Sequence, residues 1–225
     1  MSRSGVSSRK RVAFYIHLCL YKNVKRRKED ADQTRDALLR AALTIFSTRG
    51  YTASTLNEIA TSAHVTRGAL YHHFSGKAEM FNTLLQQAVD QPKQIVQVAL
   101  TEGGTFLEII LRVFVRQVVA VKTDPVYRAT VELVMFKLES NPELEPARLL
   151  LSNGRQASLE LLEGSFKDGQ RSGFVRKNLK PLELARLFLA LQIGLFHVWN
   201  SQPEGFDLEQ SANAVAEVMI AGIKA

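Results

Sequence analysis

The chain has 225 residues, 46% of them hydrophobic, which is enough apolar material for a core in one or two small domains. Its one cysteine, Cys19, excludes an intrachain disulfide and disfavours a cysteine-based zinc site, as expected of a cytoplasmic protein. The formal net charge of +7 is located at the N-terminus: residues 1–28 hold nine of the 29 Lys and Arg and no acid, whereas residues 29–225 hold 20 against 22 Asp and Glu.

Residues 9–21 (RKRVAFYIHLCLY) have the basic start and apolar stretch of a signal peptide. The apolar part is interrupted by His17, no small-residue cleavage site follows it, and it is far shorter than the roughly 20 residues that span a bilayer. We therefore expect neither secretion nor a membrane anchor. The alternative is a weak interfacial helix that tethers the protein to a membrane.

The first predicted helix runs from about Asp32 to Thr48 and is ended by Gly50. The segment Thr55–Phe74 (TLNEIATSAHVTRGALYHHF) then predicts two short helices, Leu56–Ala63 and Thr66–His73, joined by a tight turn. Thr66 is a good N-cap for the second helix, because its hydroxyl can accept an orphan backbone N–H. This pattern is typical of a helix-turn-helix.

The second of these helices is expected to have one buried and one exposed face. Val65, Leu70 and Phe74 are predicted to point inward. Gly68 and Ala69 keep the outward face thin, so that the helix could lie deep in a DNA major groove. The expected DNA-contacting residues, including those that flank the motif, are Thr55, Thr66, Arg67, Gly68, Ala69, Tyr71, His72 and Lys77.

Each of these side chains has an expected role. Arg67 can fork two donors onto a guanine edge or clamp a phosphate. Tyr71 and His72 suit phosphate oxygens, which position the helix without reading sequence, although either ring could instead only pack locally. His72 and His73 do not suggest a metal site, since neighbouring helix residues point about 100° apart. No catalytic motif, metal site or cofactor-binding loop is found in the sequence, so we expect no enzyme and no cofactor.

The rest of the chain also shows helical periodicity, which predicts an all-α protein of nine helices. Ser75 is a plausible N-cap for the fourth helix, and Pro92 should end or kink it. Asp124 and Pro125 suit the cap and first position of another helix. The expected later helices cover residues 106–121, 125–140, 143–170, 181–201 and 208–224.

Several of these segments resemble the TetR family of transcriptional regulators. The matching residues of the N-terminal part, in order and without gaps, are Ala41, Phe46, Gly50, Thr55, Ile59, Ala60, Val65, Thr66, Gly68, Tyr71, His73, Phe74, Lys77 and Phe81. His64 departs from the pattern, because the family usually has Gly in this turn, and slight local strain is expected. The looser C-terminal match, through Asp124-Pro125, Phe174-Val175-Arg176 and Trp199…Pro203…Phe206-Asp207-Leu208, is similar to the repressors of multidrug-efflux pumps.

The resemblance implies a TetR-like architecture with a helix-turn-helix domain at residues 29–87 and a ligand-binding and dimerisation domain at residues 88–225. It favours a hydrophobic pocket over a solid core, with expected lining residues Phe106, Ile110, Phe114, Gln117, Phe136, Phe166, Gln192, Phe196 and Trp199. Apolar stripes on the last two helices favour a homodimer interface, although they could also only line the protomer core. The expected interface residues are Leu187, Leu191, Leu208, Ala212, Val215 and Met219.

The basic N-terminal extension, residues 1–28, is open to two interpretations. Family members commonly begin a few residues before the first helix, so we expect a natural start near Val24; the alternative is a functional arm at residues 1–23. Lys25, Arg26 and Arg27 are expected to contact DNA phosphates, the alternative being a solvated tail.

The expected function is that of a ligand-responsive repressor of a multidrug-efflux operon, released from a palindromic operator by a hydrophobic inducer. Two rivals stay open at this point. One is a dimeric DNA-binding regulator with no small-molecule trigger. The other is a membrane-tethered factor that uses residues 9–21.

Overall fold

The computed structural model describes residues 31–225, and this part of the chain is helical almost throughout, without a β-strand. Residues 31–49 form the first helix. The all-α prediction with nine helices is confirmed for these residues. The first helix is followed by α2 (Leu56–Ser62), α3 (Arg67–His73), α4 (Lys77–Thr101), α5 (Phe106–Thr123), α6 (Pro125–Phe136), the 3-10 helix η1 (Pro142–Leu144), α7 (Glu145–Arg171), α8 (Pro181–Ser201) and α9 (Leu208–Ile223).

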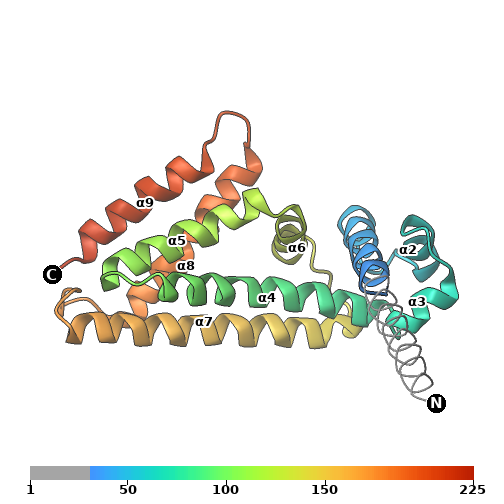
Figure 1. Ribbon diagram of the computed structural model, residues 1–225, viewed down its shortest axis with the longest axis horizontal. Helices are drawn as coiled ribbons and strands as arrows, with labels where there is room; N and C mark the ends of the chain where they lie inside the picture. Colours follow the sequence, from blue (N-terminus) through green and yellow to red (C-terminus); the bar gives the residue numbers. More distant parts are fainter. Residues whose placement is uncertain (1–30) are drawn as a thin grey trace, which may run out of the picture.

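The molecule is elongated, and α4 and α7 run side by side along its length (Figure 1). The first helix, α2 and α3 form a small group at one end, which we call the head. Helices α5, α8 and α9 lie at the other end, together with the C-terminus, and we call this part the body. The expected contacts of Lys25, Arg26 and Arg27, and every prediction for residues 1–28, lie outside the described residues.

Local capping explains where several helices begin. The Thr66 hydroxyl caps α3, as predicted, by accepting a hydrogen bond from the backbone N–H of Ala69 at 3.1 Å. Asp124 caps α6, and Pro125 occupies the first helical position, also as predicted. Ser75 is not the cap of α4; Gly76 occupies that position, and Ser75 instead donates hydrogen bonds to the carboxylate of Glu79.

Helix α4 continues through Pro92 to Thr101, so of the two expected effects of this proline, an end or a kink, the helix end does not occur. A proline inside a helix removes one backbone hydrogen bond and costs about 3 kcal/mol. Packing of α4 against α5, α6 and α7 offsets this cost, because apolar residues continue on both sides of the proline. Helix α6, in contrast, ends at Phe136 and not near Ser140.

Two apolar cores share α4. The first core is formed by the head and by Met80, Phe81, Leu84 and Leu85 at the N-terminal end of α4. It is completed by residues much later in the chain, namely Leu133, Leu144 and Ala147. The second core lies in the body and includes Ala99 of α4, with side chains from α5, α7, α8 and α9. The head is therefore packed against α6, η1 and α7 and is not an appended unit.

The turn between α2 and α3 contains a strained residue, as predicted. His64 has a φ of 57°, and it is the only non-glycine residue with positive φ in the described part of the chain. An L-residue in this region is strained by about 1–2 kcal/mol, whereas glycine adopts it freely at an entropic cost of about 0.5–1 kcal/mol.

We therefore expect His64→Gly to raise the free energy of unfolding by roughly 0.5 kcal/mol. The bulkier His64→Val, which tolerates positive φ poorly, should lower it by about 1 kcal/mol or more. Urea unfolding followed by circular dichroism measures both. A His64→Gly protein that is clearly less stable than the wild type would show that the backbone at His64 is not strained.

Candidate functional site

The exposed face of α3 is a polar surface of the head. Leu70 and Phe74 are buried in the first core, which fixes the orientation of the helix. Arg67, Tyr71 and His72 are consequently exposed on the opposite side, with 47% of Tyr71 accessible to solvent. The inward and outward positions agree with the division expected from the sequence.

Arg67 and Tyr71 form one unit on this face. The guanidinium donates a hydrogen bond to the Tyr71 hydroxyl at 3.2 Å and lies over the ring at 5.5 Å from its centroid. This hydrogen bond also raises the pKa of Arg67, so the side chain keeps its positive charge. The pair presents a cation and a phenol, both suited to phosphate oxygens or base edges.

Gly68 and Thr66 make the start of α3 narrow. A Cβ added at Gly68 would meet only the Thr66 hydroxyl, at 3.9 Å, which is an ordinary contact. The packing of the protein itself therefore does not require glycine at this exposed position. A close approach by another molecule would require it.

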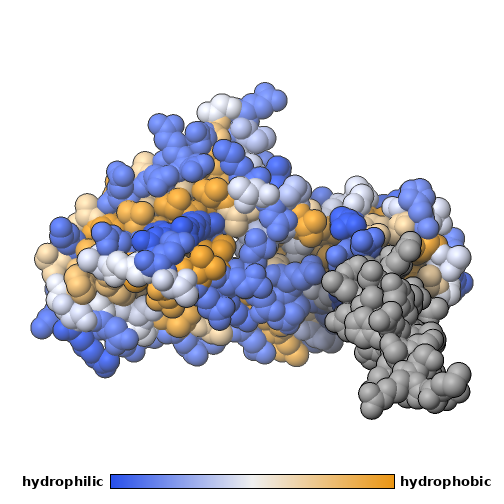
Figure 2. Space-filling model, in the orientation of Figure 1, coloured by the Kyte–Doolittle hydropathy of each residue, from blue (hydrophilic) through white to orange (hydrophobic). Residues whose placement is uncertain are grey.

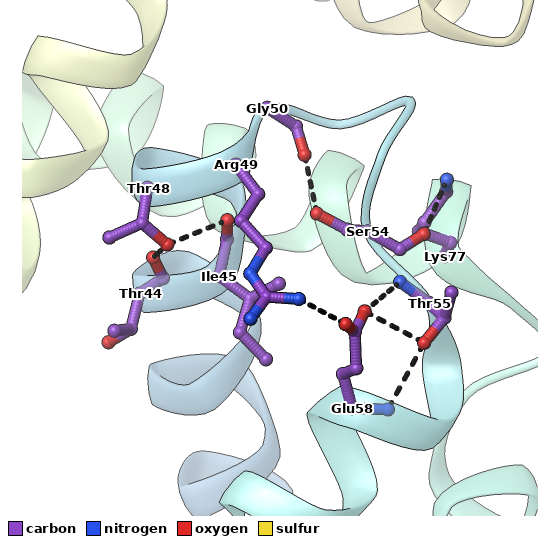
Figure 3. Close-up of polar contacts among 9 residues, drawn as sticks. All are labelled: Thr44, Ile45, Thr48, Arg49, Gly50, Ser54, Thr55, Glu58 and Lys77. Carbon is purple, nitrogen blue, oxygen red and sulfur yellow. Dashed lines mark hydrogen bonds and ion pairs between the residues drawn. The ribbon is translucent and has the colours of Figure 1, made fainter.

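Thr55 and Lys77, which were expected to flank the DNA, also have structural roles (Figure 3). The Thr55 hydroxyl accepts from the backbone N–H of Glu58 at 3.2 Å, and the Glu58 carboxylate accepts from the Thr55 backbone at 3.0 Å. The Thr55 hydroxyl also donates to the Glu58 carboxylate at 2.8 Å, and this hydrogen bond, followed by the one from the Thr55 backbone, lowers the pKa of Glu58, which also pairs with Arg49. This capping box starts α2.

The Lys77 ammonium is directed into the loop before α2. It donates to the backbone carbonyls of Tyr51 at 2.7 Å and Ser54 at 3.0 Å, and lies 4.3 Å from the centroid of the Tyr51 ring. Lys77 thus ties the N-terminal end of α4 to this loop (Figure 3). A phosphate contact by Lys77 would have to form beside these bonds or replace them.

A polar junction joins the loop 50–55 to the segment between α6 and α7, and no pattern in the sequence indicates it. The Tyr51 hydroxyl donates to Glu143 at 2.8 Å, and the Thr52 backbone N–H donates to Glu139 at 3.2 Å. Asn141 donates to the Thr52 hydroxyl at 3.0 Å. Burial, followed by the Glu143 contact, raises the pKa of Tyr51, and the hydrogen bond from the Thr52 hydroxyl lowers that of Glu139.

Two adjoining cavities lie between α4, α6, α7 and α8. The first has a volume of about 230 Å³ and also reaches α5; the second has a volume of about 630 Å³. They share five lining residues, Pro92, Val131, Ser158, Leu189 and Ile193. We call the two together the groove.

Only part of the expected pocket lines this groove. Gln117, Gln192 and Phe196 line the first cavity. Phe136 is exposed, stacked on Phe196 at 6.4 Å between ring centroids. The other expected lining residues pack into the second core and away from the groove: Phe106, Ile110, Phe114, Phe166 and Trp199.

The expected association surface is also divided. Leu187, Leu191 and Val215 line an exposed apolar channel between α8 and α9, beside Val218. Leu208 and Ala212 are fully buried within the protomer, and Met219 is almost so, although it also borders the channel. Figure 2 shows apolar surface among polar residues in the body.

Helix α8 is the one helix of residues 31–225 that is long and apolar enough to cross a membrane. It packs against α5, α7 and α9 and contributes Leu184, Phe188 and Phe196 to the second core. Length and composition alone are weak evidence for a span, because core helices pass the same test.

Comparisons with known proteins match both parts of the chain. The family "Bacterial regulatory proteins, tetR family" matches residues 38–84, and "MAATS-type transcriptional repressor, C-terminal region" matches residues 106–224. The HTH-type transcriptional repressor BepR of Brucella suis biovar 1 (strain 1330) is 30% identical over 203 residues, which cover 90% of this chain and 97% of BepR.

Solved structures show the same similarity. NalD, the secondary repressor of the MexAB-OprM multidrug efflux pump in Pseudomonas aeruginosa, is 31% identical, with a TM-score of 0.73 over 87% of this chain and 98% of NalD. SmeT, the repressor of the Stenotrophomonas maltophilia efflux pump SmeDEF, shares the fold in its triclosan complex. In that comparison the identity is 23% and the TM-score 0.71, over 85% of this chain and 92% of SmeT.

The geometry of Gly68 gives a test of the α3 face. Gly68→Ala should leave the free energy of unfolding unchanged or raise it by up to about 1 kcal/mol, because alanine favours helix. If the face enters a DNA groove, the added methyl should weaken DNA binding by about tenfold or more, measured by fluorescence anisotropy. Gly164→Ala, on α7, is the matched control, since a Cβ there meets no atom within 4 Å and the residue lies away from the head. Equal DNA affinity of both variants and the wild type would exclude a close approach at Gly68.

Proposed function

The chain belongs to the TetR family of bacterial transcriptional regulators and is a ligand-responsive, DNA-binding repressor; we propose that it controls a multidrug-efflux operon from the cytoplasm, as a homodimer on a palindromic operator. The observation that carries this proposal is the exposed face of α3, held outward by the burial of Leu70 and Phe74. A short, well-capped helix with Arg67 and Tyr71 on its free side is suited to the major groove.

The side chains of the head have different proposed roles in DNA binding. Arg67 is the residue that could read a guanine, because its fork matches two acceptors on the base edge. Tyr71 and His72 are exposed next to it and suit phosphate oxygens, which fix the register. Thr55 and Lys77 support this face by fixing α2 and the loop before it, and any phosphate contact they make is additional.

The apolar channel between α8 and α9 is the proposed dimer interface. Leu187 is 43% and Val218 74% exposed, which is unusual for side chains that line one apolar channel. In a dimer with a two-fold axis, the channel of each protomer would be covered by the same surface of its partner. The two heads could then meet two half-sites in successive major grooves.

The groove is the proposed inducer site. An apolar cavity with a few polar groups is typical of small-molecule sites, and this groove adjoins α4, which also carries the head. The inducer must bind the form with displaced heads better than the DNA-binding form, since only differential affinity shifts the equilibrium. A regulator without a trigger is not favoured, because the chain has both this groove and efflux-pump repressors among its relatives.

The direct test is binding of the purified protein to the DNA flanking its own gene, with and without a panel of hydrophobic drugs. Tight, salt-sensitive binding that some compounds abolish would support the proposal. Binding that no compound disturbs would contradict the inducer, and absence of binding would show that the operator does not lie in this DNA.

We expect Arg67→Ala to lower operator affinity by about 30-fold or more, because a fork contact contributes about 1–3 kcal/mol and one is lost from each protomer. The thermal midpoint should stay within about 1 °C, since the residue is exposed. Anisotropy titration and thermal unfolding measure the two quantities. Unchanged operator affinity would remove Arg67 from the interface.

We expect Leu187→Glu to convert the dimer into monomers, because each charge would be buried against an apolar surface. Operator affinity should fall at least about tenfold, since the two half-sites are no longer bound by one linked particle. Light scattering measures the mass. Leu149→Glu on α7 is the matched control: Leu149 is similarly exposed but lies outside the channel. A Leu187→Glu protein that remains dimeric would refute this interface.

A further inference from the structure

The described side chains that line the groove include basic residues but no acidic ones. No Asp or Glu from the described residues lines either cavity. The ionisable residues that do line them are Lys93 and Tyr127 in the first cavity and Arg155 in the second. Lys93 is exposed and paired with Asp90 at 2.8 Å, whereas Arg155 forms no ion pair within residues 31–225. Within residues 31–225 the groove is thus lined by no acidic side chain, and the unpaired charge at its edge is the positive charge of Arg155.

Two carboxylates on the neighbouring side of α4 and α6 do not supply the missing charge. Asp90 and Asp124 line a separate polar cleft that shares Tyr127 with the first cavity. Asp90 accepts from Lys93 and Gln86, and Asp124 is occupied as the cap of α6. Burial, followed by the charge of Asp124, raises the pKa of Tyr127 to about 12, so the phenol stays neutral at physiological pH.

A chain of amides fixes the polar character of the first cavity. Gln117 donates its Nε2 to the backbone carbonyl of Pro92 at 3.1 Å, which orients its amide, because a carbonyl oxygen can only accept. The Oε1 of Gln117 must then face Gln192, and it accepts from the Nε2 of Gln192 at 2.8 Å. Within residues 31–225 no group donates to the Oε1 of Gln192, so this atom can accept from a ligand. A ligand seated here therefore benefits from a hydroxyl or N–H donor.

We propose that the groove selects uncharged hydrophobic compounds that carry a hydrogen-bond donor for Gln192, and that it rejects hydrophobic cations. This inference rests on the proposed inducer site and adds its ligand class. A cation would give up its hydration in an apolar cavity with no carboxylate to replace it, and the unpaired Arg155 would repel it at the entrance.

Aromatic rings do not offset this cost. Phe196 and Tyr127 line the first cavity and could attract a cation weakly through their faces. Phe196 is already stacked on Phe136 and packed at a tilt against Trp199, whose ring is covered by the Arg128 guanidinium at 4.6 Å. With only 5% of Phe196 exposed, little of its ring is open to a further cation.

Three probes with one ring system test the inference by calorimetry on the full-length protein: 1-naphthol, 1-methoxynaphthalene and (1-naphthylmethyl)trimethylammonium. We expect 1-naphthol to bind about threefold to tenfold more tightly than the methoxy compound, as one neutral hydrogen bond provides. The cation should bind at least about 30-fold more weakly than 1-naphthol, because no group neutralises it. Equal affinity for the cation and 1-naphthol would overturn the charge selection.

Two variants of one residue locate the selection. Gln192→Glu places a carboxylate in the cavity and should improve binding of the cation at least about tenfold while weakening 1-naphthol. Gln192→Leu, the matched control, should bring no gain for the cation. Combined with Gln117→Leu, which removes the Oε1 that the first change leaves without its donor, it should abolish the preference for 1-naphthol over the methoxy compound. Helical circular dichroism and thermal unfolding establish that the variants are folded. Unchanged probe preferences in the folded Gln192→Glu protein and in the folded double variant would overturn the role of Gln192.

Release of operator DNA distinguishes this inference from the proposed function. A wild type that releases its operator for hydrophobic cations alone remains a ligand-responsive repressor, and the charge selection is then refuted. A wild type that binds 1-naphthol with the expected preferences but keeps its operator under every compound supports the ligand class and contradicts the inducer role.

Discussion

The unbroken course of α4 is the constraint on which the rest of the structure depends. Its N-terminal end belongs to the core of the head, and Ala99 near its other end belongs to the core of the body. Pro92 lies between the two and removes one backbone hydrogen bond, yet the helix continues, and the Pro92 carbonyl accepts from Gln117 at the wall of the groove. A displacement of α4 at the groove must therefore also move the head.

The parts of the molecule that could be predicted are those decided by near neighbours in the chain. Thr66 and Asp124 cap their helices because each hydroxyl or carboxylate reaches backbone N–H groups two or three residues later. His64 adopts positive φ because the turn between α2 and α3 leaves it no alternative. The buried face of α3 followed from helical spacing, so Leu70 and Phe74 were predicted correctly.

The parts that could not be predicted depend on pairs far apart in the chain. Tyr51 donates to Glu143, and nothing in the sequence around Glu143 distinguishes it from an ordinary solvated acid. Phe114, Phe166, Gln117 and Gln192 were all expected to line a pocket. Only the packing of α5, α7 and α8 decides that the two phenylalanines fill the core while the two glutamines face a cavity. For the same reason, two residues of one apolar stripe on α9 have different surroundings: Ala212 is buried within the protomer, whereas Val215 is partly exposed.

The composition of the first core has a consequence for building hybrid regulators. A fusion that transfers residues up to 87 would separate Leu84 and Leu85 from Leu133, Leu144 and Ala147, which close the same core. The transferred head would carry exposed apolar surface, and it would also lose the partners of Tyr51 and Thr52 at Glu143 and Glu139. An interchangeable unit of this protein must therefore include the segment 133–147, which makes the portable module discontinuous in sequence.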